Sequence, residues 1–281
     1  MQLQNILYNR SMDFQNIIIY TDMDGTVLTD WSLGPVVPQR SLASIKRFME
    51  KGGTFSVASG RQHLDILPFF EGLTPNAPLV QGNGTSLYDC QSEQVIYELP
   101  LSRAYKEEGI AMCREHDWIW PVTGDAHTVM QIAMGDYRDD RNKSITGDII
   151  SVEEYLSGDY TKIVYVVEDP EQIPAVRQLT AAFTTAETMQ ETLSSPLFLE
   201  CYDKRAGKGL GVRLAMEMKA LTGKTLVCVG DFYNDVPMLE VADIAACPAN
   251  APDDIKAMCR IVTCDNNAGA LADLIDILEK M

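Results

Sequence analysis

A short run of β-branched residues constrains the fold more than any other feature of this sequence. The run is Asn16-Ile17-Ile18-Ile19-Tyr20-Thr21, and it lacks the alternation of a strand that faces water on one side. A continuous apolar run of this length is typical of a strand that is buried on both faces. Such a strand needs covering layers above and below it, so the run predicts a layered α/β fold.

Strand-like and helix-like segments alternate in the two outer parts of the chain. Helical spacing of apolar residues predicts a helix over about 39–51, which Gly52-Gly53 would end with a left-handed cap. Further helices are expected after Gly207, near 237–239 and over 271–278. Further strands are expected at 54–58, 78–81, 225–229 and 243–246. This alternation predicts a Rossmann-like parallel sheet with helices on both faces.

The middle of the chain differs from the outer parts in charge. The chain has 23 Lys/Arg and 40 Asp/Glu, and residues 86–203 hold 8 and 22 of them. This segment mixes helical periodicity with alternating stretches, which predicts an α+β insert with an open antiparallel sheet and helices on one face. Trp118 and Trp120 are predicted to share one strand face in its core. We therefore expect a core domain of residues 1–85 and 204–281, interrupted by the insert.

Composition excludes several classes of partner. The net charge is −17 at pH 7, whereas nucleic acids and anionic membranes are bound by basic surfaces. No apolar run approaches the length of a membrane span, and the start of the chain lacks the pattern of a signal peptide. The seven cysteines show no CxxC spacing, so reduced thiols in a cytoplasmic protein are expected. The oligomeric state and the role of residues 1–14 stay open.

Polar residues follow three of the predicted strands. Asp22-Met23-Asp24-Gly25-Thr26 comes after the first, Ser59-Gly60-Arg61 after the second, and Gly230-Asp231-Phe232-Tyr233-Asn234-Asp235 after a later one. Lys208-Gly209 stands at the start of a predicted helix. Ligands bind at the carboxyl ends of the strands in an open parallel sheet, so these groups are expected to meet at one edge. Carboxylates gathered there repel one another unless a cation lies among them.

Together these four motifs resemble the haloacid dehalogenase (HAD) superfamily of phosphatases. The pattern Asp-x-Asp-Gly-Thr after an apolar strand is very specific, and all four motifs follow one another in the family's order. Within the superfamily the chain is similar to the Cof-type sugar phosphatases with a type IIB cap. The resemblance covers nearly the whole chain after about Asn16. It implies a HAD-like core, with residues 86–203 as an α+β cap that sets substrate specificity.

The resemblance also implies how the carboxylates work. Asp22 would be the nucleophile, because an ionised carboxylate attacks phosphorus without a deprotonating base. Asp24 would be the general acid and base, which protonates the leaving alcohol and then activates water. Mg²⁺ would be held by Asp22, the main-chain carbonyl of Asp24 and Asp231, and would bridge carboxylates and phosphate that otherwise repel one another.

Further residues would surround the phosphate. By the same resemblance, Ser59 and Gly60 would bind a phosphoryl oxygen, and Lys208 would neutralise charge on the phosphoryl group and the nucleophile. Asn234 would complete the set of phosphate ligands. Asp235 would support the metal ligands or the lysine.

Two residues admit a plainer interpretation. Asn83, in Gly82-Asn83-Gly84, is either a turn residue before the insert or a substrate contact. Arg61 either caps its helix or contacts the phosphate.

The second aspartate of the first motif narrows the range of activities that the resemblance allows. The related ion-pumping ATPases carry threonine in place of Asp24, which leaves their aspartyl phosphate long-lived. An aspartate implies rapid turnover, hence a Mg²⁺-dependent phosphatase that acts on small phosphorylated metabolites, sugar phosphates foremost. One alternative is a phosphomutase similar to the phosphomannomutases. Another is a non-catalytic, metabolite-sensing protein on the same fold, which the loss of a motif residue would favour.

Overall fold

The computed structural model describes residues 12–134 and 148–281. Residues 1–11, part of the segment whose role the sequence leaves open, lie outside the described residues. The chain divides into two compact units, Met1–Gln94 with Gly207–Met281, and Val95–Ala206. In the described residues, no helix is both long and apolar enough to cross a membrane.

The boundaries of the two units lie a little later in the chain than the predicted 85/86 and 203/204. The first boundary lies later because strand β4 (Ser86–Asp89) pairs antiparallel with β3 (Leu79–Gln81) and so belongs to the first unit. A third strand, β5 (Gln94–Glu98), completes a small sheet in the order β3-β4-β5. The chain passes into the second unit within β5.

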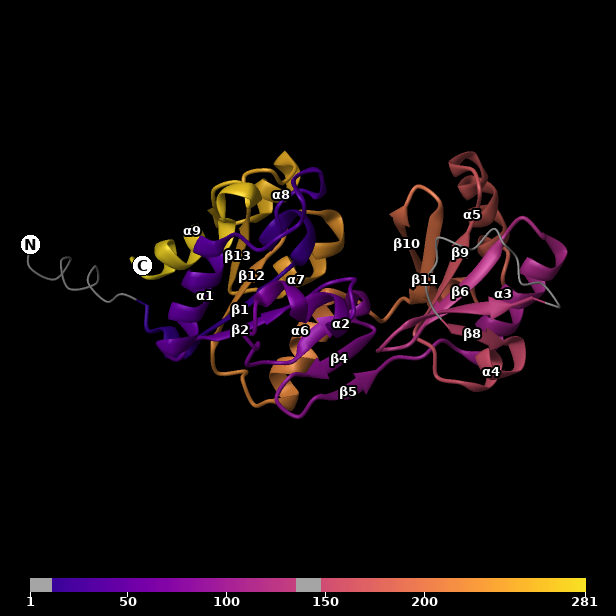
Figure 1. Cartoon of the computed structure of the whole chain (residues 1–281), viewed down its shortest axis with the longest axis horizontal. Helices are drawn as coiled ribbons and strands as arrows, with labels where there is room; N and C mark the ends of the chain where they lie inside the picture. Colours follow the sequence, from indigo (N-terminus) through magenta and orange to yellow (C-terminus); the bar gives the residue numbers. More distant parts are fainter. Residues whose placement is uncertain (1–11, 135–147) are drawn as a thin grey trace, which may run out of the picture. The chain divides into compact units, whose positions relative to one another are not determined.

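Five parallel strands form the central sheet of the first unit, in the order β14-β13-β12-β1-β2. They are β1 (Ile17–Thr21), β2 (Thr54–Val57), β12 (Thr225–Val229), β13 (Ile244–Cys247) and β14 (Ile261–Val262). Every residue of β1 is buried, as the apolar run predicts. Figure 1 shows β1 beside β12, so segments from the two outer parts of the sequence form the middle of one sheet.

Helices cover both faces of this sheet. They are α1 (Gln39–Glu50), α2 (His63–Ile66), α6 (Lys208–Met218), α7 (Val236–Val241), α8 (Asp253–Met258) and α9 (Ala270–Leu278). In Figure 1, α1 and α9 lie on one side of the sheet, and α6 and α7 lie on the other. The predicted α/β fold with a parallel-sheet core is confirmed.

The second unit is built on a six-stranded sheet, in the order β10-β11-β9-β6-β7-β8. Its strands are β6 (Trp120–Gly124), β7 (Val129–Ala133), β8 (Asp148–Ser151), β9 (Lys162–Val166), β10 (Met189–Ser195) and β11 (Phe198–Asp203). Neighbours run antiparallel except β7 and β8. Helices α3 (Arg103–Glu115), α4 (Val152–Ser157) and α5 (Ile173–Ala181) share one apolar core with residues of β9 and β11.

The two tryptophans of this unit do not share a strand face, so that prediction is wrong. Trp118 lies in the turn before β6 and packs against the helix-covered core. Trp120 is the first residue of β6 and packs against a different cluster, which contains Val164 and Val166 of β9. Because the strand begins only at Trp120, its alternation does not extend back to Trp118.

A close helix contact fixes the start of α6. A Cβ atom added to Gly209 would overlap the carbonyl oxygen of Pro237 in α7 and lie 2.6 Å from its carbonyl carbon. Only glycine therefore lets these two helices approach at this point. The contact matters for the site, because the preceding residue, Lys208, points into the protein with a side chain that is 0% exposed.

We expect Gly209→Ala to lower the free energy of unfolding by about 1–3 kcal/mol, the usual cost of forcing an extra carbon into packed surroundings. Gly223→Ala is the matched control, because an added Cβ there meets nothing within 4 Å. Urea unfolding followed by circular dichroism measures both. Equal stability of the two variants would contradict the assigned role of Gly209.

Candidate active site

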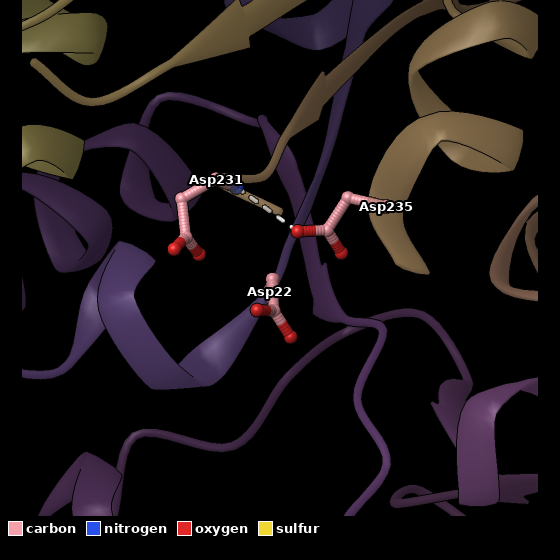
Figure 2. Close-up of side chains that lie close together, drawn as sticks. All are labelled: Asp22, Asp231 and Asp235. Carbon is pink, nitrogen blue, oxygen red and sulfur yellow. Dashed lines mark hydrogen bonds between the residues drawn. The ribbon is translucent and has the colours of Figure 1, made fainter. Parts of the chain in front are cut away.

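Three aspartates meet at the carboxyl edge of the central sheet (Figure 2). Asp22 directly follows β1, Asp231 lies two residues after β12, and Asp235 ends the short helix η9 (Tyr233–Asp235). One carboxylate oxygen from each lies within 4.8 Å of the others. Because β1 and β12 are adjacent in the sheet, residues far apart in the sequence are brought to one point.

A buried lysine joins two of these aspartates. The Nζ atom of Lys208 donates hydrogen bonds of 2.6 Å to Oδ1 of Asp22 and of 2.6 Å to Oδ1 of Asp235. Burial favours the neutral amine and would lower the pKa of Lys208, but the two carboxylates outweigh it and raise this pKa above its ordinary value. Lys208 is therefore a fixed positive charge next to the predicted nucleophile.

Asp235 differs from the other two aspartates in its partners. Its Oδ2 accepts hydrogen bonds from the main-chain N–H of Asp231 at 2.9 Å, drawn as a dashed line in Figure 2, and of Phe232 at 3.1 Å. Its Oδ1 accepts from Lys208. Both oxygens thus bind the protein itself, which suits a supporting carboxylate.

Asp22 and Asp231 keep more of their acceptor capacity. Within the described residues, each accepts one hydrogen bond from another side chain, Asp22 from Lys208 and Asp231 from Oγ1 of Thr26 at 2.7 Å. An ionised carboxylate has about four acceptor positions. These two residues can therefore bind a cation without losing a protein contact.

Burial, together with neighbouring negative charge, raises the pKa of both carboxyls. Burial and the charge of Asp235 raise the pKa of Asp22 to about 8, although Lys208 opposes them. Burial is also the main cause that raises the pKa of Asp231 to about 6. A cation between the two would favour their ionised forms and so oppose these shifts, and carboxylate oxygens are the ligands that Mg²⁺ takes in proteins. The donor set therefore fits the magnesium ion that the resemblance implies.

A glycine allows the turn after β1 to approach Asp231. Gly25 has φ +74°, and a Cβ there would lie 2.9 Å from Cγ of Asp231. Its carbonyl oxygen accepts a hydrogen bond of 2.7 Å from Nδ2 of Asn250. The glycine of the first motif is thus needed both for its left-handed backbone and for its missing side chain.

Asp24 forms an ion pair with Arg61. Nε of Arg61 donates to one carboxylate oxygen at 2.8 Å, and Nη2 donates to the other at 2.6 Å. The rings of Trp31 and Phe69 each have their centroid 5.2 Å from the guanidinium carbon. The guanidinium therefore contacts the predicted acid and base, an arrangement that neither sequence interpretation of Arg61 includes.

The loop after β2 meets the turn that carries Asn83. Ser59 is buried, and its carbonyl oxygen accepts a hydrogen bond of 2.9 Å from the main-chain N–H of Asn83. A Cβ at Gly60 would lie 3.1 Å from Nδ2 of Asn83. Asn83 has φ +56°, and its buried Oδ1 has no hydrogen-bond partner in the described part of the chain. Asn234, the remaining predicted phosphate ligand, lies exposed on η9.

Sequence reasoning missed two residues that shape the site. Thr26 is part of the first motif but was given no role, and it holds Asp231. Asn250 follows β13, holds the Gly25 turn, and accepts a hydrogen bond of 3.1 Å from the N–H of Asn266. A polar residue just after another parallel strand was the signal that could have identified Asn250.

Comparisons of sequence agree with this geometry. The profile of the haloacid dehalogenase-like hydrolases matches residues 19–275. Pyridoxal phosphate phosphatase YbhA of Escherichia coli is 28% identical over 280 residues, which cover 92% of this chain and 97% of that protein. A putative phosphatase of Haemophilus influenzae is 27% identical over 268 residues, covering 92% and 96%.

Solved structures show the same fold at lower identity. TM0651 of Thermotoga maritima matches with a TM-score of 0.79 and 19% identity, over 92% of this chain and 96% of that one. The HAD subclass IIB sugar phosphatase BT4131 matches with a TM-score of 0.72 and 18% identity, over 94% and 99%. With the family profile spanning both outer parts of the sequence and the insert, the chain belongs to the haloacid dehalogenase-like hydrolases, in the Cof-type branch that its motifs resemble, and it is a phosphatase.

Proposed function

We propose that this phosphatase is Mg²⁺-dependent and hydrolyses phosphate monoesters of small metabolites, sugar phosphates foremost, through an aspartyl phosphate on Asp22. One observation carries the proposal: Asp22 is held at 2.6 Å by the buried ammonium of Lys208, beside the carboxylate of Asp231. A fixed positive charge next to a buried carboxylate suits attack on a phosphate dianion, which a lone carboxylate would repel.

In the first half of the reaction, a carboxylate oxygen of Asp22 attacks phosphorus, and the bond from phosphorus to the leaving oxygen breaks. Asp24 gives its proton to that oxygen, so the product leaves as an alcohol. Lys208 offsets the negative charge on the nucleophile and the phosphoryl group. A magnesium ion held by Asp22, the Asp24 carbonyl and Asp231 would supply further charge neutralisation.

In the second half, a water oxygen attacks the phosphorus of the aspartyl phosphate. Asp24 takes a proton from that water, and the bond from phosphorus to Asp22 breaks, which releases inorganic phosphate and restores both aspartates. Ser59, Gly60, Asn83 and Asn234 are the proposed phosphate and substrate contacts. The buried, unpartnered Oδ1 of Asn83 next to Gly60 supports a ligand at that place.

We further propose that the second unit is a type IIB cap that selects the substrate. It is inserted between the serine and lysine motifs, where the family resemblance implies a cap. Its acidic character favours a substrate whose remainder is neutral or cationic. The described residues hold all seven cysteines as free thiols, which supports a reducing, cytoplasmic location.

Phosphate release from a panel of metabolites tests the substrate proposal. The panel contains sugar phosphates and also pyridoxal phosphate, because the 28% identical relative is named for that substrate. A phosphomutase would instead isomerise a sugar phosphate, require a bisphosphate activator and release no free phosphate.

We expect EDTA to abolish phosphate release and Mg²⁺ to restore it. Asp231→Asn should lower both the apparent affinity for Mg²⁺ and turnover, because one of the two available carboxylates is lost. A titration of activity against free Mg²⁺ measures this. Full activity in EDTA would exclude the proposed metal dependence.

A pair of glycine variants tests the same site without removing a carboxylate. Gly25→Ala displaces Asp231, whereas Gly34 has φ +79° but no atom within 4 Å of an added Cβ. Gly34→Ala thus keeps the backbone strain and lacks the clash. We expect only Gly25→Ala to weaken Mg²⁺ dependence and turnover. Equal effects of Gly25→Ala and Gly34→Ala would show that backbone strain alone causes the loss of turnover.

Substitutions of Asp22 and of Asp24 should impair the reaction at different steps. Asp22→Asn removes measurable turnover, because an amide is a poor nucleophile. Asp24→Asn keeps the nucleophile and still reacts with 4-nitrophenyl phosphate, whose leaving group needs no proton. Hydrolysis of the aspartyl phosphate then slows by about 10²- to 10⁴-fold, the usual worth of acid–base help. Mass spectrometry of rapidly quenched protein should detect phosphate on the peptide that contains Asp22.

An experiment with oxygen isotopes could contradict the covalent mechanism. A phosphorothioate ester made chiral with ¹⁷O and ¹⁸O should keep its configuration at phosphorus through the two successive displacements of the covalent mechanism, whereas direct attack by a metal-activated water would invert it. Inversion at phosphorus would rule out the covalent mechanism, whatever the activity of the variants.

A further inference from the structure

The bidentate pair between Arg61 and Asp24 is more tightly built than a surface ion pair. The exposed fractions of the two side chains are 18% and 43%. Both oxygens of the carboxylate are engaged by two adjacent donors of one guanidinium. A planar fork of this kind fixes the plane and direction of a carboxylate, which a single point charge does not.

Two aromatic rings hold the guanidinium in turn. Trp31 belongs to the short helix η3 (Trp31–Leu33) and Phe69 to η4 (Leu67–Phe70), and each ring centroid lies 5.2 Å from the guanidinium carbon. Contacts of this type stabilise a cation and restrict its movement. They also give a reason for Trp31 to lie at the surface, where the residue is 67% exposed.

The backbone of Arg61 is anchored as well. Its N–H donates to Oγ of Ser59 at 3.2 Å, and its carbonyl oxygen accepts from the N–H of Gly82 at 3.2 Å. Main chain, side chain and rings thus direct the guanidinium at Asp24. The two guanidinium N–H groups of this fork are taken by Asp24 and are not available to a phosphate.

We infer that Arg61, held by Trp31 and Phe69, is the positioning residue for the carboxyl group of Asp24. The inference rests on the proposed function, in which Asp24 is the acid and base. It assigns Arg61 to Asp24 rather than to the phosphate. Both halves of the reaction then depend on Arg61. Binding of the substrate does not, and neither does attack by Asp22 on an ester whose leaving group needs no proton.

Two aryl esters separate these roles. Phenyl phosphate needs a proton on its leaving oxygen more than 4-nitrophenyl phosphate does. With Arg61→Gln, the burst of phenol from phenyl phosphate should slow about 10- to 100-fold, part of the loss expected without acid catalysis. The burst of 4-nitrophenol should keep its rate, later turnover should slow, and phosphate should accumulate on Asp22. The substrate concentration that gives half of the maximal burst rate should stay within about twofold, since no phosphate contact is lost.

Three further variants keep the test independent of folding. Arg61→Lys retains the charge but lacks the fork, so it should resemble Arg61→Gln. Trp31→Ala should slow the phenol burst about 3- to 10-fold, while Leu33→Ala, at a neighbouring residue that is 68% exposed, should leave it unchanged. Thermal unfolding checks that all four variants are folded.

Other outcomes would overturn the inference. A raised KM with unchanged kcat would assign Arg61 to phosphate binding, and recovery by Arg61→Lys would show that charge alone suffices. Equal losses on both esters without phosphate on Asp22 would indicate a structural role. Failure of the proposed function is distinguishable, because then the wild type releases no phosphate or Asp24→Asn behaves as the wild type.

Discussion

The buried ammonium group of Lys208 is the interaction on which the rest of the site depends. Without it, Asp22 and Asp235 would be two carboxylates withdrawn from water and facing each other, and breaking such a buried pair usually costs about 3–5 kcal/mol. Asp235 is in turn anchored by two main-chain N–H groups of the loop after β12. One lysine therefore ties the end of β1 to the end of β12, and the proposed nucleophile is oriented before substrate arrives.

Much of the core was predictable because its signals are local. The continuous apolar run before Asp22 becomes a fully buried strand, and residues 225–229 become the strand that ends before Asp231. Parallel strands align their carboxyl ends, so the positions of the motifs after two strands were enough to bring Asp22 and Asp231 together. Lys208 starts a helix, and its place beside Asp22 was expected from the family resemblance.

What the sequence did not reveal depends on contacts between distant segments. No pattern within the sequence pairs Arg61 with Asp24. Nor does any pattern place Trp31 and Phe69 around a guanidinium, because each of these residues is also compatible with an ordinary position in a loop or helix. The prediction for Trp118 failed in the opposite way, because a local pattern suggested a shared face that the structure does not have. Its spacing from Trp120 suggested a shared face, but the strand starts only at Trp120, and alternation holds only within a strand.

The order of synthesis adds a requirement that follows from the adjacency of β1 and β12. β1 leaves the ribosome before the inserted unit and needs neighbours on both sides, whereas β12 is made only after that unit. Until then the edge of β1 that pairs with β12 is uncovered, a state in which strands bind other chains. A nascent chain that stops short of Lys208 lacks the counter-charge of its proposed nucleophile, so the capacity to cleave phosphate esters arises only after the whole inserted unit has been made.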